Sequence, residues 1–346
     1  MSQSLLENEI LEQPAALSNL INEESVHALT LAQILRGSFN YIMIAARGTS
    51  DNAARYAQYL FQMANRIPVA LATPSVFSVY KKQPDLSGAL VLAISQSGMS
   101  PDIVSVVEEG KRQGRPSLAI TNDPDSPLAQ IADDVIPLHT GPERAVAATK
   151  TYTTSLAAMA LLSYGFADDP DMLKAVEKLP GWVESTLVKV LPLTERMERY
   201  RFMDRGVVIG RGYNYCTAFE IALKVKELTG VTTVPYSSAD FLHGPVATVH
   251  DGYPVLAIAH SGEVQQDMLE LLQKVRELGA EVIVISDLEK AREFGHLSFA
   301  IPEGVPEWLS PVVNVLPGQI LGWQLAIYKG LDPDRPKGLS KVTETV

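Results

Sequence analysis

Short runs of apolar residues alternate with longer amphipathic stretches along most of the chain. The run YIMIAA (41–46) is typical of a buried strand, and in the segment after it Ala53, Ala57 and Leu60 recur at helical spacing. Further elements are predicted in the same order, at 67–73 (apolar run IPVALAT), 89–95 (strand), 101–114 (helix), 116–121 (strand), 127–132 (helix) and 134–138 (strand). Short apolar strands separated by helices indicate a parallel sheet that is covered on both faces. The pattern therefore predicts an α/β fold.

The same pattern occurs a second time, about 164 residues further along the chain. Gly48 in the first copy matches Gly212, and Gly98 matches Gly262. The second copy is predicted to hold strands and helices at 207–210 (strand), 215–228 (helix), 255–259 (strand), 264–278 (helix) and 282–286 (strand). Ordered matches at nearly constant spacing indicate an internal repeat. We therefore expect two tandem copies of one doubly wound, flavodoxin-like domain.

The repeat suggests a division of the chain into five parts. They are a helical segment (1–35), a first α/β domain (36–170), a mainly helical connector (171–200), a second α/β domain (201–330) and an extended tail that closes the site (331–346).

Charge and composition exclude several classes of protein. The net charge of −11 argues against a protein that binds nucleic acid by neutralising phosphates. A single cysteine, Cys216, permits neither a disulfide framework within the chain nor a cysteine-based zinc site. The N-terminus lacks the pattern of a secretion signal, and the most apolar stretches are shorter than the roughly 18 residues that a membrane span requires. We expect a cytoplasmic protein with no membrane contact, no metal and no cofactor.

Two donor-rich loops follow strands of the first copy. One contains Gly48 followed by two hydroxyl residues, and the other reads SQSGMSPD (95–102), in which Ser100 is placed as a helix N-cap before Pro101. In open α/β sheets ligands bind at the carboxyl ends of the strands, and helix N-termini favour anions. These loops therefore predict a phosphate-binding cradle, although such serines also occur as ordinary turn and cap residues.

The second copy carries a different set of polar residues. Its loops lack the serine-rich pattern, but Lys224 and Glu227 lie three residues apart on one predicted helix, and His243 follows in the motif HGP. A lysine–glutamate pair at this spacing is usually a surface ion pair, and His243 is equally compatible with an ordinary turn. Residues alone leave both interpretations open.

Taken together, the motifs identify a resemblance to the double sugar isomerase (SIS) domain family, and in particular to the isomerase half of glucosamine-6-phosphate synthase. The motifs that carry it extend over almost the whole chain: RGTS (47–50), SQSGMSPD (95–102), TGPERAVAATKTYTT (140–154), ALKVKELTG (222–230), LHGP (242–245) and GLSKVTETV (338–346).

The resemblance implies roles for particular residues. The 6-phosphate of a sugar would be held by Thr49, Ser50, Ser95, Gln96, Ser97 and Ser100. The sugar would be bordered by Gly48, Glu143, Val146, Ala148 and Ser340, where Ala148 stands in place of a serine of the synthase. Glu227 would be the proton-transfer base with Lys224 beside it. His243 would assist ring opening from the partner subunit of a homodimer, and Lys341 would fold over the sugar.

The implied reaction is the conversion of glucosamine 6-phosphate and water to fructose 6-phosphate and ammonia. Glutamine-dependent synthesis is not expected, because Cys216 lies in mid-chain and no amidotransferase domain is present in the sequence. Two alternatives stay open. One is a related enzyme, either an aldose–ketose phosphosugar isomerase or a fructosamine-6-phosphate deglycase. The other is a regulator that binds a sugar phosphate without catalysis.

Overall fold

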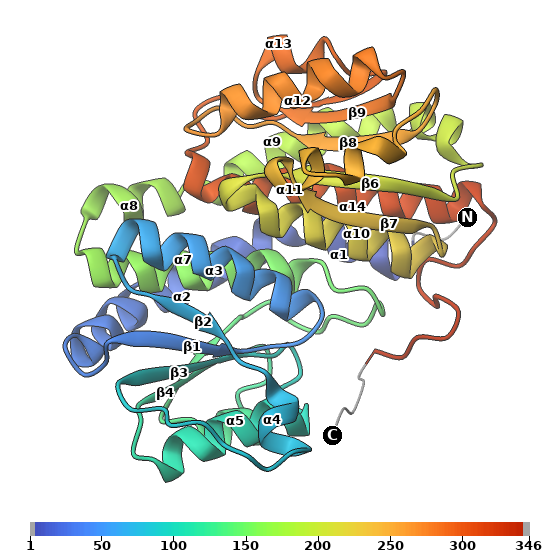
Figure 1. The fold of residues 1–346 in the computed structure, drawn as a ribbon. Coiled ribbons are helices and arrows are strands. Elements are labelled where there is room, and N and C mark those ends of the chain that lie inside the picture. Colours follow the sequence, from blue (N-terminus) through green and yellow to red (C-terminus); the bar gives the residue numbers. More distant parts are fainter. Residues whose placement is uncertain (1–3, 342–346) are drawn as a thin grey trace. The chain divides into compact units, whose positions relative to one another are not determined.

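The computed structural model describes residues 4–341, which divide into two compact units built around separate sheets (Figure 1). The N-terminal sheet unit comprises residues 15–143, 150–178 and 340–341. The C-terminal sheet unit comprises residues 4–14, 144–149 and 179–339.

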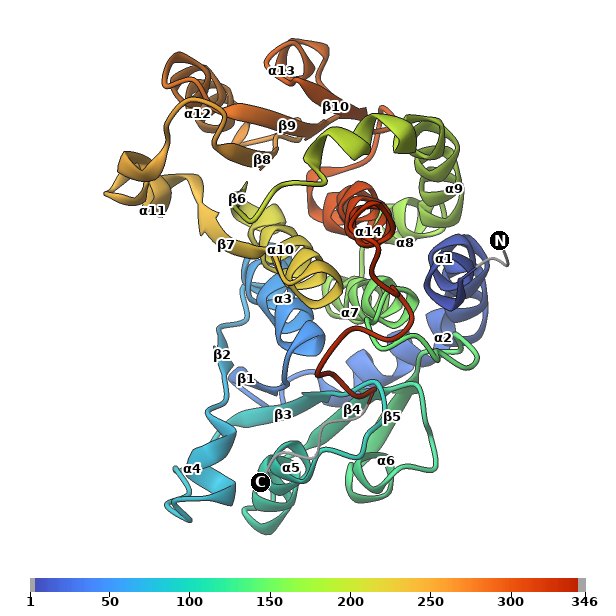
Figure 2. The ribbon, with the colours of Figure 1, turned by 90° about the vertical axis from the view of Figure 1, so that its right-hand side faces the viewer.

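The N-terminal sheet unit contains five parallel strands in the order β2-β1-β3-β4-β5. Their bounds are β1 Tyr41–Ala45, β2 Val69–Leu71, β3 Ala89–Ile94, β4 Ser117–Thr121 and β5 Asp134–Pro137. Figure 2 shows α3 (Thr49–Asn65) and α7 (Lys150–Ala167) over one face of this sheet, and α4 (Pro74–Ser78), α5 (Pro101–Arg112) and α6 (Pro127–Ile131) over the other. The helix α8 (Pro170–Val176) follows α7. With helices on both faces, the central strands β3 and β4 are buried along their whole length.

The C-terminal sheet unit repeats this order as β7-β6-β8-β9-β10, again with parallel strands. The strands are β6 Arg205–Gly210, β7 Thr232–Ser237, β8 Pro254–Ile258, β9 Glu281–Ser286 and β10 Leu297–Ala300. One face is covered by α10 (Tyr215–Thr229) and α14 (Ser310–Tyr328), and the other by α11 (Ser238–Leu242), α12 (Gln265–Glu277) and α13 (Glu289–Arg292) (Figure 1). The identical strand order confirms the predicted repeat and the doubly wound α/β fold.

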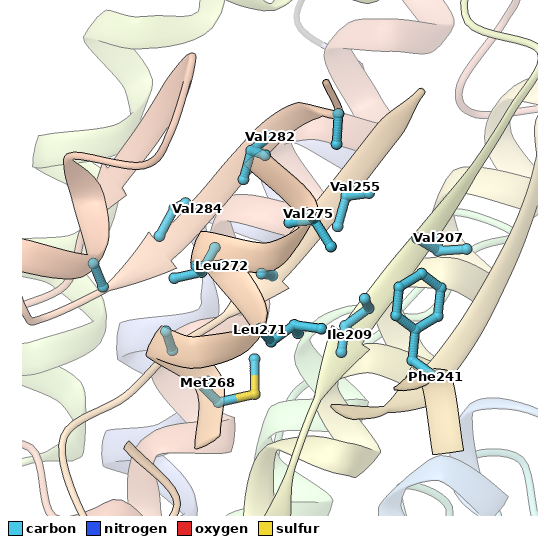
Figure 3. Packing of buried hydrophobic residues seen from close by; sticks show 14 of the residues in the cluster. Val207, Ile209, Phe241, Val255, Met268, Leu271, Leu272, Val275, Val282 and Val284 are labelled. Carbon is cyan, nitrogen blue, oxygen red and sulfur yellow. The ribbon is translucent and has the colours of Figure 1, made fainter. Parts of the chain in front are cut away.

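Hydrophobic burial between helix and sheet holds each unit together. In the C-terminal sheet unit, Val255 of β8 and Ile209 of β6 pack against Leu272 and Met268 of α12, as Figure 3 shows. All four side chains are fully buried. Burying an aliphatic side chain of this size contributes about 1.5–3 kcal/mol, so a few such residues outweigh any single surface ion pair.

A close contact between two helices fixes the position of α10. A Cβ added at Gly318 of α14 would lie 2.3 Å from Cγ1 of Ile221 on α10, so only glycine permits this approach. Both helices lie within the C-terminal sheet unit, where α14 is buried on nearly all sides. The packing therefore gives α10, the helix that carries Lys224 and Glu227, a rigid support.

The ends of the chain contain several further helices. The N-terminal segment forms α1 (Leu5–Leu11) and α2 (Gln13–Leu35), as the sequence predicts, and residues 179–200 form α9 (Leu179–Val190) and the 3₁₀ helix η1 (Leu191–Tyr200). The two backbone N–H groups that begin α1 donate to the carboxylate of Asp334, at 2.9 Å each. Residues 331–341 of the predicted extended tail contain turns but neither helix nor strand, and residues 342–346 lie outside the described part of the chain. Among the helices of the described residues, none is both long and apolar enough to cross a membrane.

Candidate functional site

The two donor-rich loops of the N-terminal sheet unit leave the same edge of the sheet. Strands β1 and β3 are neighbours, and Ala45, the last residue of β1, is paired in register with Ala93, one residue before the end of β3. An ion pair joins the loops: Nε of Arg47 donates to Oδ2 of Asp102 at 2.8 Å. Asp102 is fully buried in the first turn of α5, whereas the Arg47 side chain is about half exposed (49%). The structure thus brings together the two segments that the sequence singled out as a cradle.

The loop after β3 is tightly constrained. Gly98 has φ +62°, and a Cβ at this position would lie 2.1 Å from Oγ of Ser126. The N–H of Gly98 donates to Oγ of Ser95 at 3.1 Å, and the N–H of Asn122 donates to the carbonyl of Gln96 at 3.1 Å. These contacts hold the loop in a defined conformation, and such preorganisation lowers the entropy cost of binding a ligand.

The helices α3 and α5 begin at these loops. Ser100 is the N-cap of α5 with Pro101 at the first helical position, as predicted, yet its hydroxyl makes no capping hydrogen bond. Gly48 is the N-cap of α3 and has φ +55°, and it too provides no side-chain cap. Helix N-termini carry partial positive charge. The helix starts and the half-buried hydroxyls of Thr49, Ser50 and Ser97 make this edge suitable for an anion.

A buried carboxylate anchors the lysine of the tail. Glu143 has a fully buried side chain that accepts hydrogen bonds from the N–H of Thr151 at 3.1 Å and from Oγ1 of Thr151 at 2.8 Å. Nζ of Lys341 forms an ion pair with Oε2 of the same carboxylate at 2.9 Å. The structure thus brings Lys341 and Glu143 together within the N-terminal sheet unit. Ser340, next to this lysine, is exposed.

Helix α10 of the C-terminal sheet unit carries a buried charged cluster. Nζ of Lys224 lies 2.6 Å from Oε2 of Glu227 and 3.4 Å from Oε1 of Glu220. Lys224 and Glu220 are almost completely buried (1% and 0% exposed), while Glu227 keeps 25% of its side chain exposed. A buried ammonium requires such counter-charges. The interpretation of Lys224 and Glu227 as an ordinary surface pair is therefore wrong, and Glu227 is the member of the cluster with the most exposed side chain.

The remaining predicted residues lie in two other segments. His243 is exposed at the C-terminal end of α11, where its N–H donates to the carbonyl of Asp240. Val146 and Ala148 are half-buried in the segment 144–149. The carboxylate of Glu9 accepts hydrogen bonds from the N–H groups at the start of that segment.

Three residues that form ion pairs in these segments were not predicted from the sequence: Arg47, Asp102 and Glu220. Arg47 and Asp102 are 55 positions apart, and nothing in the sequence pairs them before the register of β1 and β3 is known. Glu220 was recognisable in principle, because it precedes Lys224 by one helical turn. No group of His, Cys, Asp or Glu within residues 4–341 could hold a metal ion.

The chain belongs to the SIS domain family. The family's model, described as SIS domain, matches residues 38–163 and again residues 203–327. The two matches coincide with the two sheets and account for the repeat.

Relatives and solved structures agree with this assignment. The isomerizing glutamine–fructose-6-phosphate aminotransferase of Pyrococcus horikoshii is 34% identical over 339 residues, which are 96% of this chain and 56% of that protein. The chain thus spans about half the length of the curated relatives it matches. The C-terminal domain of glucosamine–fructose-6-phosphate aminotransferase from Francisella tularensis superposes with a TM-score of 0.88 at 28% identity, covering 96% of this chain and 98% of that one. A Silicibacter pomeroyi protein provisionally named a phosphosugar isomerase gives a TM-score of 0.85 at 32% identity, covering 96% and 100%.

Proposed function

We propose that the chain is an isomerising glucosamine-6-phosphate deaminase, which converts glucosamine 6-phosphate and water to fructose 6-phosphate and ammonia. The observation that carries the proposal is the pair formed by buried Lys224 and accessible Glu227 on α10. The similarity of the chain to isomerising aminotransferases, whose names include fructose 6-phosphate, supports a phosphosugar as the substrate.

The phosphate of the substrate binds in the cradle of the N-terminal sheet unit. Hydroxyl and amide donors surround it there, from Thr49, Ser50, Ser95, Gln96, Ser97 and Ser100. Gly48, Val146, Ala148 and Ser340 border the sugar. Binding a remote anionic group orients the reacting carbons and supplies part of the rate enhancement by positioning.

Glu227 acts as the base that moves a proton between adjacent carbons. In the open-chain aldose it removes the proton from C2, which gives an enolamine with the hydroxyl on C1 and the amine on C2. Return of a proton to C1 leaves an imine at C2, and water hydrolyses this imine to the ketose and ammonia. One carboxylate serves both proton transfers if it reaches both carbons, and such general acid–base catalysis contributes about 10²–10⁴-fold in rate.

The two lysines provide positive charge where the reaction develops negative charge. Lys224 lies against the base and stabilises negative charge on the neighbouring substrate oxygen, while Glu220 balances Lys224 when Glu227 takes up the proton. Lys341 folds over the sugar, and buried Glu143 determines where its ammonium group lies. His243 assists ring opening from the partner subunit of a homodimer, a role compatible with its exposure in the single chain.

A product assay tests the proposal. Purified protein is incubated with glucosamine 6-phosphate, and ammonia and fructose 6-phosphate are measured separately. We expect both products in equal amounts. Absence of turnover, in a protein that still binds inorganic phosphate, would reject the enzyme in favour of a non-catalytic sugar-phosphate-binding regulator.

A second candidate is an aldose–ketose phosphosugar isomerase that moves the same proton without releasing ammonia. The similarity to the Silicibacter pomeroyi protein favours it. A panel of hexose 6-phosphates, amino-hexose 6-phosphates and fructosamine 6-phosphates separates this candidate, and a deglycase, from the deaminase. Turnover of neutral sugar phosphates with no ammonia from amino sugars would establish the isomerase.

A further inference from the structure

The loops of the C-terminal sheet unit that correspond to the phosphate cradle contain a carboxylate of the chain itself. Gly212 and Gly262 are the repeat counterparts of Gly48 and Gly98, and they follow the neighbouring strands β6 and β8. Glu307 of the 3₁₀ helix η4 (Glu307–Leu309) lies against both. Its Oε2 accepts a hydrogen bond from the N–H of Glu263 at 2.9 Å.

The Glu307 carboxylate fills the space next to Gly262. A Cβ added at Gly262, where φ is +145°, would lie 2.2 Å from Oε2 of Glu307. A Cβ added at Gly212 would lie 3.7 Å from Oε1 of the same carboxylate. The two oxygens therefore lie one toward each loop, an arrangement that a bound oxyanion between these loops would adopt.

The sequence relates this glutamate to a residue of the first copy. Pro306 and Glu307 stand 164 positions after Pro142 and Glu143, the same spacing that separates the paired glycines. Both pairs precede the long buried helix of their unit. In the first copy the carboxylate of Glu143 binds Thr151 and Lys341. In the second copy the carboxylate of Glu307 instead accepts a hydrogen bond from the loop that follows β8.

The charge of Glu307 acts on its surroundings. Burial, followed by the nearby negative charge of Glu307, raises the pKa of Tyr213 to about 12. Ser261 in the same loop also donates to a carboxylate, that of Asp287. The second cradle therefore already contains negative charge, which would repel a phosphate dianion.

We propose that Glu307 occupies the anion site of the C-terminal sheet unit as a built-in substitute for phosphate, so that each chain binds one sugar phosphate and not two. This inference rests on the proposed function, because it takes the equivalent loops of the first copy to bind phosphate. The inference predicts that small oxyanions, tetrahedral or planar, bind at the anion site of the C-terminal sheet unit once Glu307 is replaced by a residue with a shorter side chain.

The test uses calorimetric titration with inorganic phosphate. The background variant Ser97→Ala/Ser100→Ala removes two hydroxyl donors of the first cradle and is expected to bind phosphate only weakly. Adding Glu307→Ala to this background should restore binding at least ten-fold above the background. The matched variant Glu307→Gln, whose amide still fills the space, should not restore it.

Three results would overturn the inference, and a fourth would instead count against the proposed function. A folded Glu307→Ala background that binds no phosphate overturns the inference, and so does equal binding by the Glu307→Gln chain. If the Glu307→Ala chain unfolds, phosphate or acetate should restore its fold, whereas chloride at equal ionic strength should not. Failure of both phosphate and acetate to restore the fold overturns the inference. Absence of phosphate binding by the unmodified chain instead rejects the first cradle.

Discussion

Replacing Arg47 with alanine perturbs the contact that joins the two loops of the phosphate cradle. Arg47 donates to Oδ2 of Asp102 at 2.8 Å, and Oδ1 of this fully buried carboxylate has no hydrogen-bond partner among residues 4–341. Without Arg47, a buried negative charge would stand uncompensated in the first turn of α5, next to the proposed phosphate.

The structure sets the size of both expected effects. Breaking a fully buried ion pair costs about 3–5 kcal/mol, and breaking an exposed pair costs less than about 1 kcal/mol. Because Arg47 is half exposed, we expect Arg47→Ala to lower the free energy of unfolding by about 1–3 kcal/mol. Repulsion between the uncompensated Asp102 and a phosphate dianion should weaken phosphate binding by about 10–100-fold, equivalent to about 1.4–2.8 kcal/mol.

Titration with inorganic phosphate and thermal unfolding measure these effects in four chains: the unmodified chain, Arg47→Ala, Asp102→Asn and the double variant. The double variant should recover most of the affinity that Arg47→Ala loses, because no charge is left unpaired. Arg112→Ala is the matched control, since it removes an exposed cation from its ion pair with the buried Glu109 at the other end of α5. Unchanged affinity in Arg47→Ala, or a double variant as weak as Arg47→Ala, would refute the reasoning.

Three further predictions follow from particular residues. Gly98→Ala should abolish phosphate binding measured by calorimetry, because its Cβ would lie 2.1 Å from Oγ of Ser126; retained affinity would show that the loop adapts. A second prediction concerns pH. The pKa of Tyr213 is about 12 in the folded chain, whereas an unfolded tyrosine has a pKa near 10. The free energy of unfolding should therefore fall by up to about 2.7 kcal/mol as pH rises from 10 to 12, because ionisation then favours the unfolded chain. Tyr213→Phe should reduce that fall in pH-dependent denaturant melts, and an identical pH profile would contradict the assignment. Mixing inactive His243→Ala and Glu227→Gln chains should restore part of the activity, whereas no recovery despite subunit exchange would exclude shared sites.

Periodicity and the repeat predicted the fold, since buried parallel strands leave a strong apolar signal. The strands at 41–46, 89–95 and 282–286 agree with the structure within a residue at each end. Strands β7 and β10 escaped prediction because they lie at the sheet edges and are only partly buried, so their apolar pattern is interrupted by polar positions.

The candidate site was predictable only where its residues are close in sequence. The loop 95–100 carries its own signature of serines and glycine, and its conformation follows from local contacts. The pairs Arg47–Asp102 and Glu143–Lys341 join residues 55 and 198 positions apart, so strand order and chain path decide them. The burial of Lys224 depends on the packing of α10 against α14, which local spacing does not determine.

The central claim is that Glu227 moves the proton between sugar carbons. Turnover of glucosamine 6-phosphate by Glu227→Gln, compared with the unmodified chain and with the exposed-surface control Glu277→Gln, tests it most directly. We predict a fall in kcat of about 10²–10⁴-fold for Glu227→Gln, with phosphate affinity close to that of the unmodified chain and no change for the control. The variant still folds, because Glu220 remains beside Lys224. A folded Glu227→Gln chain that retains full turnover would contradict the account.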